Sequence, residues 1–309
     1  MNWIKRLAPG IKALLSPLKK RLGEGEKSLW KNCSCGKLTL KDDFKKNLFE
    51  CPHCFKTHLI SCRQRFNIFF DNSDYTIIDY GSPPDDPSKW SDPRGKYIDR
   101  LKAARKKTGE NETMLFASGL LNGMQCTVGA MDFSFFGGSV SPGVGECFLS
   151  GAEHSIKNKQ PMILFATSGG MRMESGSILS LQQMVRMTIA CQELKKNKIP
   201  FILCAGGHVM GGTTASVASL ADILISESKE FLWGFSGKRI IEQNLREKLG
   251  KEVQTSAWVL EHGGLDKIVP RKDLRSEIYN ILSILLKVKE KEINNTSNVA
   301  SNNKPLQAS

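Results

Sequence analysis

The sequence predicts an α/β protein whose main body is a spiral of repeated ββα units. From residue 114 onward, segments of strand length alternate with helical segments. One motif also repeats: ILFATSGGMR at 163–172 is echoed by FILCAGGHVMGGTT at 201–214. Each copy joins an apolar strand to a Gly-Gly pair and the first turn of a helix. Repetition of such units favours a spiral α/β fold over a doubly wound sheet.

The elements of this main body are expected in a regular order. Residues 97–109 read as a basic helix that ends at Gly109, and 114–117 and 124–130 as a hairpin around the Asn122-Gly123 turn. Residues 133–136 are expected to form a further strand before a glycine turn at 137–139. The other predicted strands are 163–166, 201–204, 223–226 and 231–234, and the other predicted helices are 145–157, 178–195, 213–220, 238–249 and 274–287.

The chain divides into four predicted parts. Residues 1–27 form a basic N-terminal arm, 28–56 a small cysteine module, 60–287 the main domain and 288–309 a polar, disordered tail.

Composition limits the class of protein. The 309 residues are 40% hydrophobic and 24% charged, which is typical of a soluble globular protein. No apolar run approaches the roughly 20 residues that span a bilayer. The net charge of +13 predicts attraction to polyanions: nucleic acid, a membrane surface or a phosphorylated cofactor. Nine unevenly placed cysteines predict one metal site in a reducing, cytoplasmic setting instead of a disulfide framework.

Four of the cysteines stand in two close pairs. Cys33 and Cys35 are separated by one residue, and Cys51 and Cys54 belong to a CPHC turn. Two such pairs can surround one structural Zn²⁺, so a zinc ribbon is expected. The first pair is one residue shorter than the usual C-x-x-C, which leaves a degenerate ribbon with free thiols as the alternative. The conceivable substitute ligands are His53 first, then Asn32, His58 and Cys62.

The two glycine turns predict the chemistry. Glycine permits a tight turn and close approach to a ligand, and the N–H groups that open a helix have no partner within it. They carry the positive end of its dipole and can stabilise a developing oxyanion. The repeat therefore indicates an enzyme that acts on a thioester or similar carbonyl through an enolate, although a tight αβ turn can also be purely structural.

The chain resembles the carboxyltransferase β subunits of bacterial-type acetyl-CoA carboxylase from its first residue to about residue 287. The motifs that carry the resemblance are NWIKR at the start, Trp30 before the first cysteine, CPHC, KYIDRLKAARKKTGE (96–110), FFGGSVSPGVGE (135–146), SGGMRM (168–173), ILSLQQM (178–184), GFSGKRIIEQNLREKL (234–249) and EHGGLDKIV (261–269).

The resemblance implies a crotonase-like fold and an α2β2 heterotetramer with a separate α subunit. It also implies transfer of CO₂ from carboxybiotin, which is made by biotin carboxylase and held by the biotin carboxyl carrier protein, to acetyl-CoA. The product would be malonyl-CoA for fatty acid biosynthesis. Gly211 and Gly212 would hold the thioester oxygen, with Gly169 and Gly170 shaping the neighbouring turn. No side chain stands out as an obligatory general base, and basic residues not identified by the sequence would bind the CoA phosphates.

Some positions depart from the family pattern. Gly207 to Met210 replace a usual Asp-Pro-Thr-Thr, Met171 replaces a small residue, one residue is added near 174–177, and Lys238 stands where proline is common. A carboxyltransferase for another acyl-CoA, such as propionyl-CoA, is therefore an alternative.

Two further alternatives come from other classes of protein. A serine hydrolase would use Ser139 or Ser168, but no G-x-S-x-G elbow is present. A nucleic-acid-binding ribbon protein would account for the zinc and the charge but not for the glycine turns, so nucleic-acid binding is expected at most as a secondary property.

Overall fold

The computed structural model describes residues 29–288 and divides the chain into two compact units, with the boundary between His58 and Leu59. The predicted basic arm lies outside the described residues, as does the predicted tail apart from residue 288. No helix between residues 29 and 288 is long and apolar enough to cross a membrane.

The smaller unit is a short hairpin with one helical turn. Strands β1 (Trp30–Asn32) and β2 (Leu38–Leu40) pair antiparallel, and α2 (Lys41–Lys46) follows directly. Its core is a group of rings: Phe44 meets Phe49 edge-on at 5.9 Å and His58 at 4.9 Å between ring centroids. A core this small does not stabilise a fold by itself, so a unit of this size needs a metal or another cross-link.

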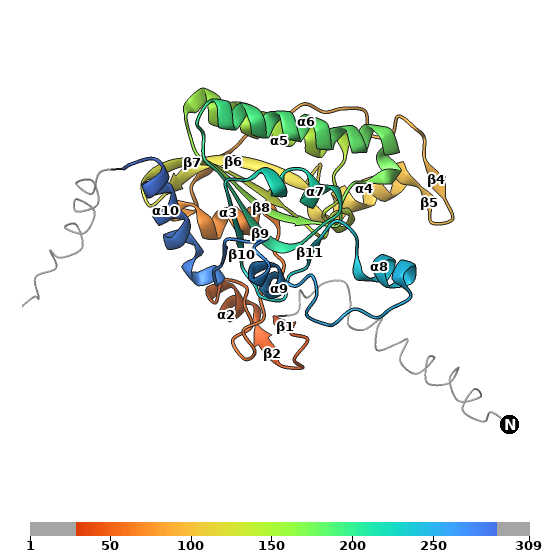
Figure 1. Ribbon diagram of the computed structural model, residues 1–309, viewed down its shortest axis with the longest axis horizontal. Coiled ribbons are helices and arrows are strands. Elements are labelled where there is room, and N and C mark those ends of the chain that lie inside the picture. Colours follow the sequence, from red (N-terminus) through yellow and green to blue (C-terminus); the bar gives the residue numbers. More distant parts are fainter. Residues whose placement is uncertain (1–28, 289–309) are drawn as a thin grey trace, which may run out of the picture. The chain divides into compact units, whose positions relative to one another are not determined.

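The larger unit is built on one sheet whose strands follow each other in space as they do along the chain. The order is β12-β10-β9-β8-β7-β6-β3, and every neighbouring pair from β7 to β12 is parallel. The strands are β3 (Tyr75–Ile77), β6 (Met114–Leu121), β7 (Met124–Met131), β8 (Met162–Ser168), β9 (Phe201–Met210), β10 (Ile223–Ser226) and β12 (Lys267–Ile268). Because the chain always steps in one direction, the crossover helices α5 (Pro142–Asn158) and α6 (Ser177–Lys196) lie on the same face (Figure 1). A doubly wound sheet reverses direction, so the predicted spiral is confirmed.

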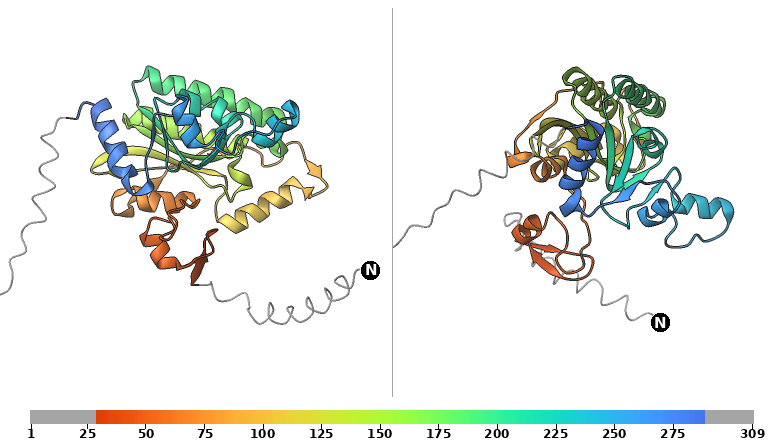
Figure 2. Two further views of the ribbon diagram at one scale, coloured as in Figure 1. Left: turned by 60° about the horizontal axis from the view of Figure 1, so that its bottom comes forward. Right: turned by 60° about the vertical axis from the view of Figure 1, so that its left-hand side comes forward.

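Alternation along the strands divides the core into two layers. In β8, Met162, Leu164 and Ala166 join the layer that contains residues of α5 and α6. Ile163 and Phe165 point to the opposite layer, where α3 (Cys62–Phe69) and α10 (Leu274–Leu285) cover the sheet (Figure 2). Strands buried on both faces read as continuous apolar runs, which is why the sequence marks them clearly.

The other elements connect or cover this sheet. They are α4 (Tyr97–Thr108), α7 (Gly212–Ala215), α8 (Lys238–Leu245), α9 (Ser256–Glu261), the short strands β4 (Ser91–Asp92), β5 (Gly95–Lys96) and β11 (Trp233–Gly234), and the 3₁₀ turns η1 (Asp71–Ser73), η2 (Phe136–Gly138), η3 (Met173–Ser175), η4 (Ala218–Leu220) and η5 (Arg271–Asp273).

Most predicted elements are confirmed, and the exceptions have local causes. The hairpin turns at Asn122-Gly123, and α4 ends at Gly109, whose φ of 77° is left-handed. The predicted strand at 133–136 is wrong: Phe135 is buried beside Tyr97 and Leu101, and the chain turns at once into η2. The predicted helix at 213–220 is broken into α7 and η4, and that at 238–249 ends with α8.

A carboxylate is buried at the carboxyl end of β10. Glu227 lies between the guanidinium groups of Arg65 and Arg271, and the Arg271 Nη2–Glu227 Oε2 distance is 2.6 Å. Burial raises the pKa of Glu227, but the two arginines outweigh it, so the pKa lies below its ordinary value. The ion pair therefore stabilises the fold only while Glu227 is ionised.

We expect Glu227→Gln to reduce the free energy of unfolding by about 3–5 kcal/mol at pH 7, because it leaves buried guanidinium groups without a counter-charge. For the unmodified chain, the contribution is complete above the unfolded pKa of about 4.3 and is lost as the pH falls through the lowered folded pKa. Urea unfolding at pH 7 and at pH 3.5 measures both effects. The exposed Glu153→Gln is the control, and equal losses in the two variants would contradict the prediction.

Candidate active site and cysteine cluster

The two predicted glycine turns lie against each other where β8 and β9 end. These strands are parallel neighbours, so their carboxyl ends meet at one edge of the sheet. Gly170 has a φ of 106° and Gly211 a φ of 66°, a region that L residues rarely occupy. A β-carbon on Gly211 would lie 3.1 Å from the Cα of Gly170. The structure thus brings the two Gly-Gly pairs into one place with almost no side-chain volume between them.

The backbone N–H groups of these glycines differ in what they bind. Gly169 donates to the carbonyl of Gly137 at 2.9 Å, and Gly170 donates to Ser168 Oγ at 3.1 Å. Gly211 donates to the carbonyl of Gly234 in β11 at 2.8 Å. Among the described residues, the N–H of Gly212 has no acceptor, although Gly212 is buried at the start of α7. Buried N–H groups are rarely unpartnered, so this donor is available to a ligand.

Hydroxyl groups hold the two turns together. Ser168 Oγ lies 2.8 Å from Thr213 Oγ1, and it also accepts the N–H of Gly170. These contacts connect the end of β8 to the start of α7. Ser168 therefore has a structural role here and is not set up as the nucleophile that the hydrolase alternative needs.

Arg172 anchors the first turn, a role that the sequence did not reveal. Its side chain is 2% exposed; Nη2 donates to Thr113 Oγ1 at 2.6 Å and lies 3.1 Å from Glu112 Oε2. Its backbone N–H donates to the carbonyl of Val140 at 2.7 Å, while Val140 donates to Gly170. These partners and Tyr97, whose hydroxyl accepts a hydrogen bond from Arg172 Nη1, are 32 to 75 positions away along the chain, so no local pattern could identify them.

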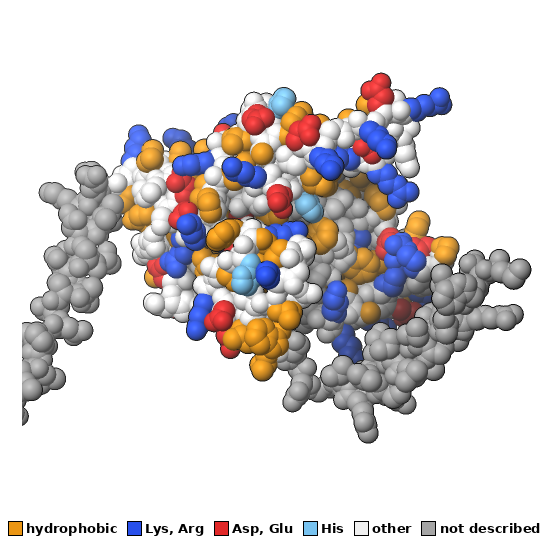
Figure 3. All heavy atoms as spheres, turned by 90° about the horizontal axis from the view of Figure 1, so that it is seen from below, with side chains coloured by type: hydrophobic (Ala, Val, Ile, Leu, Met, Phe, Trp, Pro, Cys, Tyr) orange, Lys and Arg blue, Asp and Glu red, His pale blue; other side chains and the backbone are white. Residues whose placement is uncertain are grey.

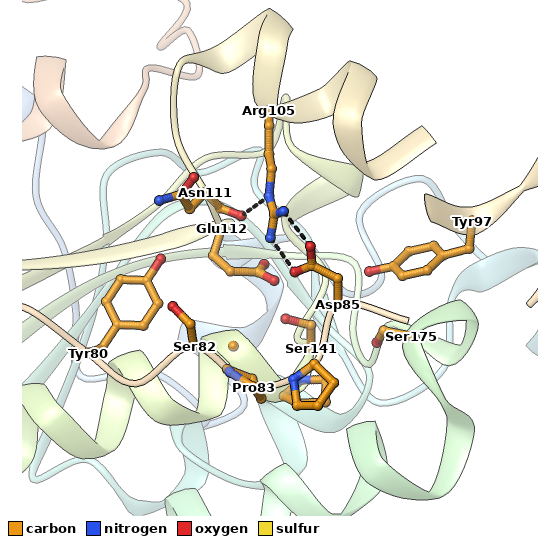
Figure 4. A pocket seen from close by; sticks show the side chains of 13 residues that line it. Tyr80, Ser82, Pro83, Asp85, Tyr97, Arg105, Asn111, Glu112, Ser141 and Ser175 are labelled. Carbon is orange, nitrogen blue, oxygen red and sulfur yellow. Dashed lines mark hydrogen bonds and ion pairs between the residues drawn. The ribbon is translucent and has the colours of Figure 1, made fainter. Parts of the chain in front are cut away.

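A small cavity lies behind this anchor. Tyr80, Glu112 and the Arg105–Asp85 ion pair surround it, and Arg105 donates two hydrogen bonds to Asp85 at 2.6 and 2.7 Å (Figure 4). Its volume of about 30 Å³ is enough for water but far smaller than the roughly 300–1,000 Å³ of typical ligand pockets. The cavity cannot hold a thioester substrate and is not the candidate site.

His208, which stands beside the second glycine turn, is built into the sheet. Its Nδ1 accepts the backbone N–H of Leu232 at 2.9 Å, so a neutral ring carries its proton on Nε2. The ring meets Phe133 and Phe231 edge-on at 6.5 and 5.9 Å. These contacts hold the imidazole ring in place, which fits a structural role for His208.

The structure brings together the four predicted ligand cysteines. The Sγ atoms of Cys33, Cys35, Cys51 and Cys54 all lie within 4.8 Å of one another. The separations are 3.7 Å for Cys33–Cys54 and 3.9 Å for Cys35–Cys51. Four sulfurs around one zinc at 2.3 Å would be about 3.8 Å apart, so the cluster fits a tetrahedral metal site. His53, the first substitute considered, is exposed and is not part of the cluster.

Local geometry explains how the short first pair still works. Gly36, directly after Cys35, has a φ of 81° and donates to the carbonyl of Cys33 at 2.9 Å, which closes a tight turn. The N–H of Cys35 lowers the pKa of Cys33 to about 5, with His58 contributing from 3.4 Å. At Cys54 the Lys56 N–H lowers the pKa, but burial and the other thiols raise it to about 12. Four neighbouring thiolates repel one another, so a cation is needed to hold all four deprotonated.

Known proteins resemble this chain at the level of sequence. A family model described as "Carboxyl transferase domain" matches residues 95–308. The acetyl-coenzyme A carboxylase carboxyl transferase subunit beta of Pelagibacter ubique is 43% identical over 97% of this chain and 96% of its own length. The protein of the same name from Brucella canis is 39% identical over 93% of each chain.

Solved structures show the same fold at lower identity. A transcarboxylase 12S crystal structure with methylmalonyl-coenzyme A bound has a TM-score of 0.58 at 21% identity, covering 73% of this chain and 40% of its own. A Pseudomonas malonate decarboxylase hetero-tetramer has a TM-score of 0.56 at 17% identity, covering 80% of this chain and 92% of its own. These likenesses confirm the predicted crotonase-like class of fold.

Proposed function

The chain belongs to the family of acetyl-coenzyme A carboxylase carboxyl transferase beta subunits, and from that premise we propose how its residues carry out the reaction. As a member it is a carboxyltransferase, which transfers a carboxyl group from carboxybiotin to acetyl-CoA and forms malonyl-CoA for fatty acid synthesis. The observation that carries the proposal for the site concerns Gly212: the residue is buried, and its N–H has no acceptor within residues 29–288.

Gly212 donates its N–H to the thioester oxygen of the acyl group. Loss of a methyl proton moves negative charge onto this oxygen, and a fixed donor stabilises the enolate without reorganisation. Gly211, Gly169 and Gly170 keep side chains away from the same point, and their own N–H groups hold the turns in place. The role predicted for the four glycines is thus divided: Gly212 donates a hydrogen bond to the substrate, and the other three shape the site.

The chain positions its substrates instead of supplying a base. Three polar side chains close to the turns in sequence, those of Ser168, Thr213 and His208, are engaged in structural hydrogen bonds. Carboxybiotin, made by biotin carboxylase and held by the biotin carboxyl carrier protein, would bring the carboxyl group. On losing CO₂, its ureido nitrogen would accept the methyl proton of acetyl-CoA, and the enolate would then attack the CO₂. Orientation and oxyanion stabilisation remain as the contribution of this subunit.

A partner subunit covers one face of α6. Ile178, Leu181, Val185 and Ile189 are 72%, 46%, 61% and 56% exposed and recur at helical spacing. The opposite face of α6 is buried, so the helix is apolar on both sides, as helices in the interior of assemblies are. The occupant is the carboxyltransferase α subunit, in an α2β2 arrangement, because the relatives are named as one subunit of acetyl-CoA carboxylase.

The position of this stripe supports the same partner. Met184, on the same helix, packs against Gly212. A subunit on the stripe would therefore border the acyl site and could complete it. The similar malonate decarboxylase structure is itself a hetero-tetramer.

The four-cysteine cluster holds one structural Zn²⁺. Its sulfur separations match a tetrahedral S₄ site, and the small ring core of residues 29–58 leaves the metal to stabilise the unit. The zinc takes no part in the transfer.

Two earlier predictions stay open beside this function. A cytoplasmic location agrees with nine free cysteines. Secondary nucleic-acid binding has less support, because Lys and Arg side chains are mixed with Asp and Glu over the described part of the face in Figure 3.

The reverse reaction tests the function most directly. The purified chain, alone and with its co-expressed α partner, is given malonyl-CoA and biotin, and CoA-dependent biotin carboxylation is measured. We expect activity only with the partner. No activity from a stable complex, in this assay and in the forward direction with acetyl-CoA, would overturn the function.

A surface variant separates the partner's role from the chemistry. Val185→Asp places a charge in the exposed stripe: the Val185 side chain is 61% exposed, whereas that of the neighbouring Met184 packs against Gly212. We expect the subunits to dissociate at least tenfold more readily and activity to recover at high subunit concentration. Lys157→Asp, at an exposed position on α5, is the control. If Val185→Asp leaves dissociation of the subunits unchanged, the stripe is not part of the interface.

A further inference from the structure

Two methionine side chains pack directly on the proposed oxyanion donor. A β-carbon placed on Gly212 would lie 2.8 Å from Met171 Cε and 2.8 Å from Met184 Sδ. Met171 also has its Cγ 3.0 Å from the same point. Met171 belongs to the first glycine turn and Met184 to α6, and both are only partly buried. The space on the side-chain face of Gly212 is therefore occupied by two flexible thioethers.

The backbone of the first turn fixes where Met171 stands. Met171 forms a parallel bridge with Val140, held by hydrogen bonds of Val140 to Gly170 at 2.9 Å and of Arg172 to Val140 at 2.7 Å. The buried guanidinium of Arg172 secures the next residue. Only the side chain of Met171 is thus free to adapt, and it is directed at Gly212.

Geometry of the thioester then places the acyl chain beside this side chain. The alkyl group and the oxygen are bonded to the same carbonyl carbon, so an alkyl group lies within a few ångströms of the donor that binds the oxygen. Side chains packed on Gly212 would therefore border the carbon that receives the carboxyl group. A longer acyl chain needs the room that the methionine fills.

We propose that Met171 is a specificity-determining residue that restricts the acyl group to acetyl by occupying the space beside the oxyanion donor. This inference rests on the proposed function of Gly212. Met184 forms the other side of the same restriction from α6. Because methionine is unbranched and adaptable, the restriction acts through volume and not through a rigid wall.

The test compares two acyl substrates in one complex. kcat/KM for acetyl-CoA and for propionyl-CoA is measured for the chain with its α partner, and again for Met171→Ala. One methylene is worth about 10–200-fold in discrimination in an apolar pocket. We expect the propionyl-to-acetyl ratio to rise at least tenfold in Met171→Ala, mainly through propionyl-CoA turnover.

Two variants keep the result interpretable. Met173→Ala removes the same side chain from an exposed position in η3 and is expected to leave the ratio unchanged. Met171→Leu retains most of the side-chain volume, so we expect it to remain selective for acetyl-CoA. If Met171→Ala fails to fold, this variant still tests the role of side-chain volume at position 171. A purely structural methionine would lower the melting temperature without moving the ratio.

The outcomes distinguish the two levels of the proposal. An inactive parent complex with both substrates would count against the proposed function. An active parent complex whose ratio stays within twofold in Met171→Ala, or a Met171→Leu variant that accepts propionyl-CoA as readily as acetyl-CoA, would overturn the role of Met171 alone.

Discussion

Gly212→Pro is expected to lower kcat for carboxyl transfer by about 10²–10³-fold, the usual cost of losing one oxyanion donor. Proline removes the backbone N–H, and its ring also adds carbon atoms beside Met171 and Met184. Position 212 is the first residue of α7, where proline fits a helix. Gly211 before it has a φ of 66° and a ψ of −138°, the mirror image of the extended conformation usual before proline, which glycine can adopt because it has no β-carbon. Steady-state kinetics of the complex in the forward direction measure the loss.

Gly212→Ala is the matched variant, because it keeps the N–H and adds only a β-carbon. That carbon meets Met171 Cε and Met184 Sδ at 2.8 Å, and both are ends or near-ends of flexible side chains that can move. We expect kcat/KM for carboxyl transfer to fall tenfold or less in Gly212→Ala, mainly because KM increases. Equal losses in the two variants would show that crowding, and not the hydrogen bond, determines the rate.

Cys51→Ala is expected to abolish stoichiometric zinc binding and to unfold residues 29–58. The apparent binding free energy of a structural zinc site is about 10–16 kcal/mol, and in so small a unit it is also the free energy of folding. Cys51 is buried, and its Sγ lies 3.9 Å from that of Cys35. Zinc per chain after dialysis against a chelator, and protease sensitivity of this segment in the full chain, measure the two effects.

Cys191→Ala is the matched control for this prediction. Cys191 is also buried, and burial raises its pKa to about 12. It belongs to the larger unit and is not a member of the four-cysteine cluster. We expect it to bind zinc as the unmodified chain does and to resist proteolysis at residues 29–58. A Cys51→Ala chain that kept one tightly bound zinc would rule out the four-cysteine site.

The sequence was most reliable where one local signal determines the backbone. Asn122-Gly123 specified the hairpin, Gly109 ended α4, and the strands buried on both faces appeared as apolar runs. The four cysteines came together as their spacing predicts. The glycine pairs at 169–170 and 211–212 came together because neighbouring parallel strands end at one edge.

Predictions failed where residues distant in the sequence determine the local backbone conformation. Residues 133–136 have the composition of a strand, but Phe135 packs against Tyr97 and the chain turns. Strand β9 continues through Gly206 and Gly207 to Met210, because β11 pairs with Val209 and Met210 from a later part of the chain. A β-carbon on Gly207 would lie 2.2 Å from Thr167 Oγ1, so this glycine permits close packing and not a turn.

The same limit applied to the site. The sequence could not show that the carbonyl of Gly234 accepts the N–H of Gly211, or that the N–H of Gly212 has no acceptor in the part of the chain that the structure describes. It also gave no role to Arg172, whose partners come from other elements. Composition identifies the donors that exist, but only tertiary structure shows which of them are already used.

The back layer of the larger unit has a consequence for how the protein is made. That layer is closed by α3 and α10, which come from opposite ends of the unit and cover the apolar faces of the strands between them. Synthesis delivers Ile163, Phe165 and Ile202 long before Ile278 and Leu282 leave the ribosome. The nascent chain therefore carries a half-covered apolar sheet until α10 emerges, and exposed apolar surface of this kind makes a folding chain prone to aggregation. Packing of α10 is thus the step that buries the apolar surface of this layer in the newly made subunit.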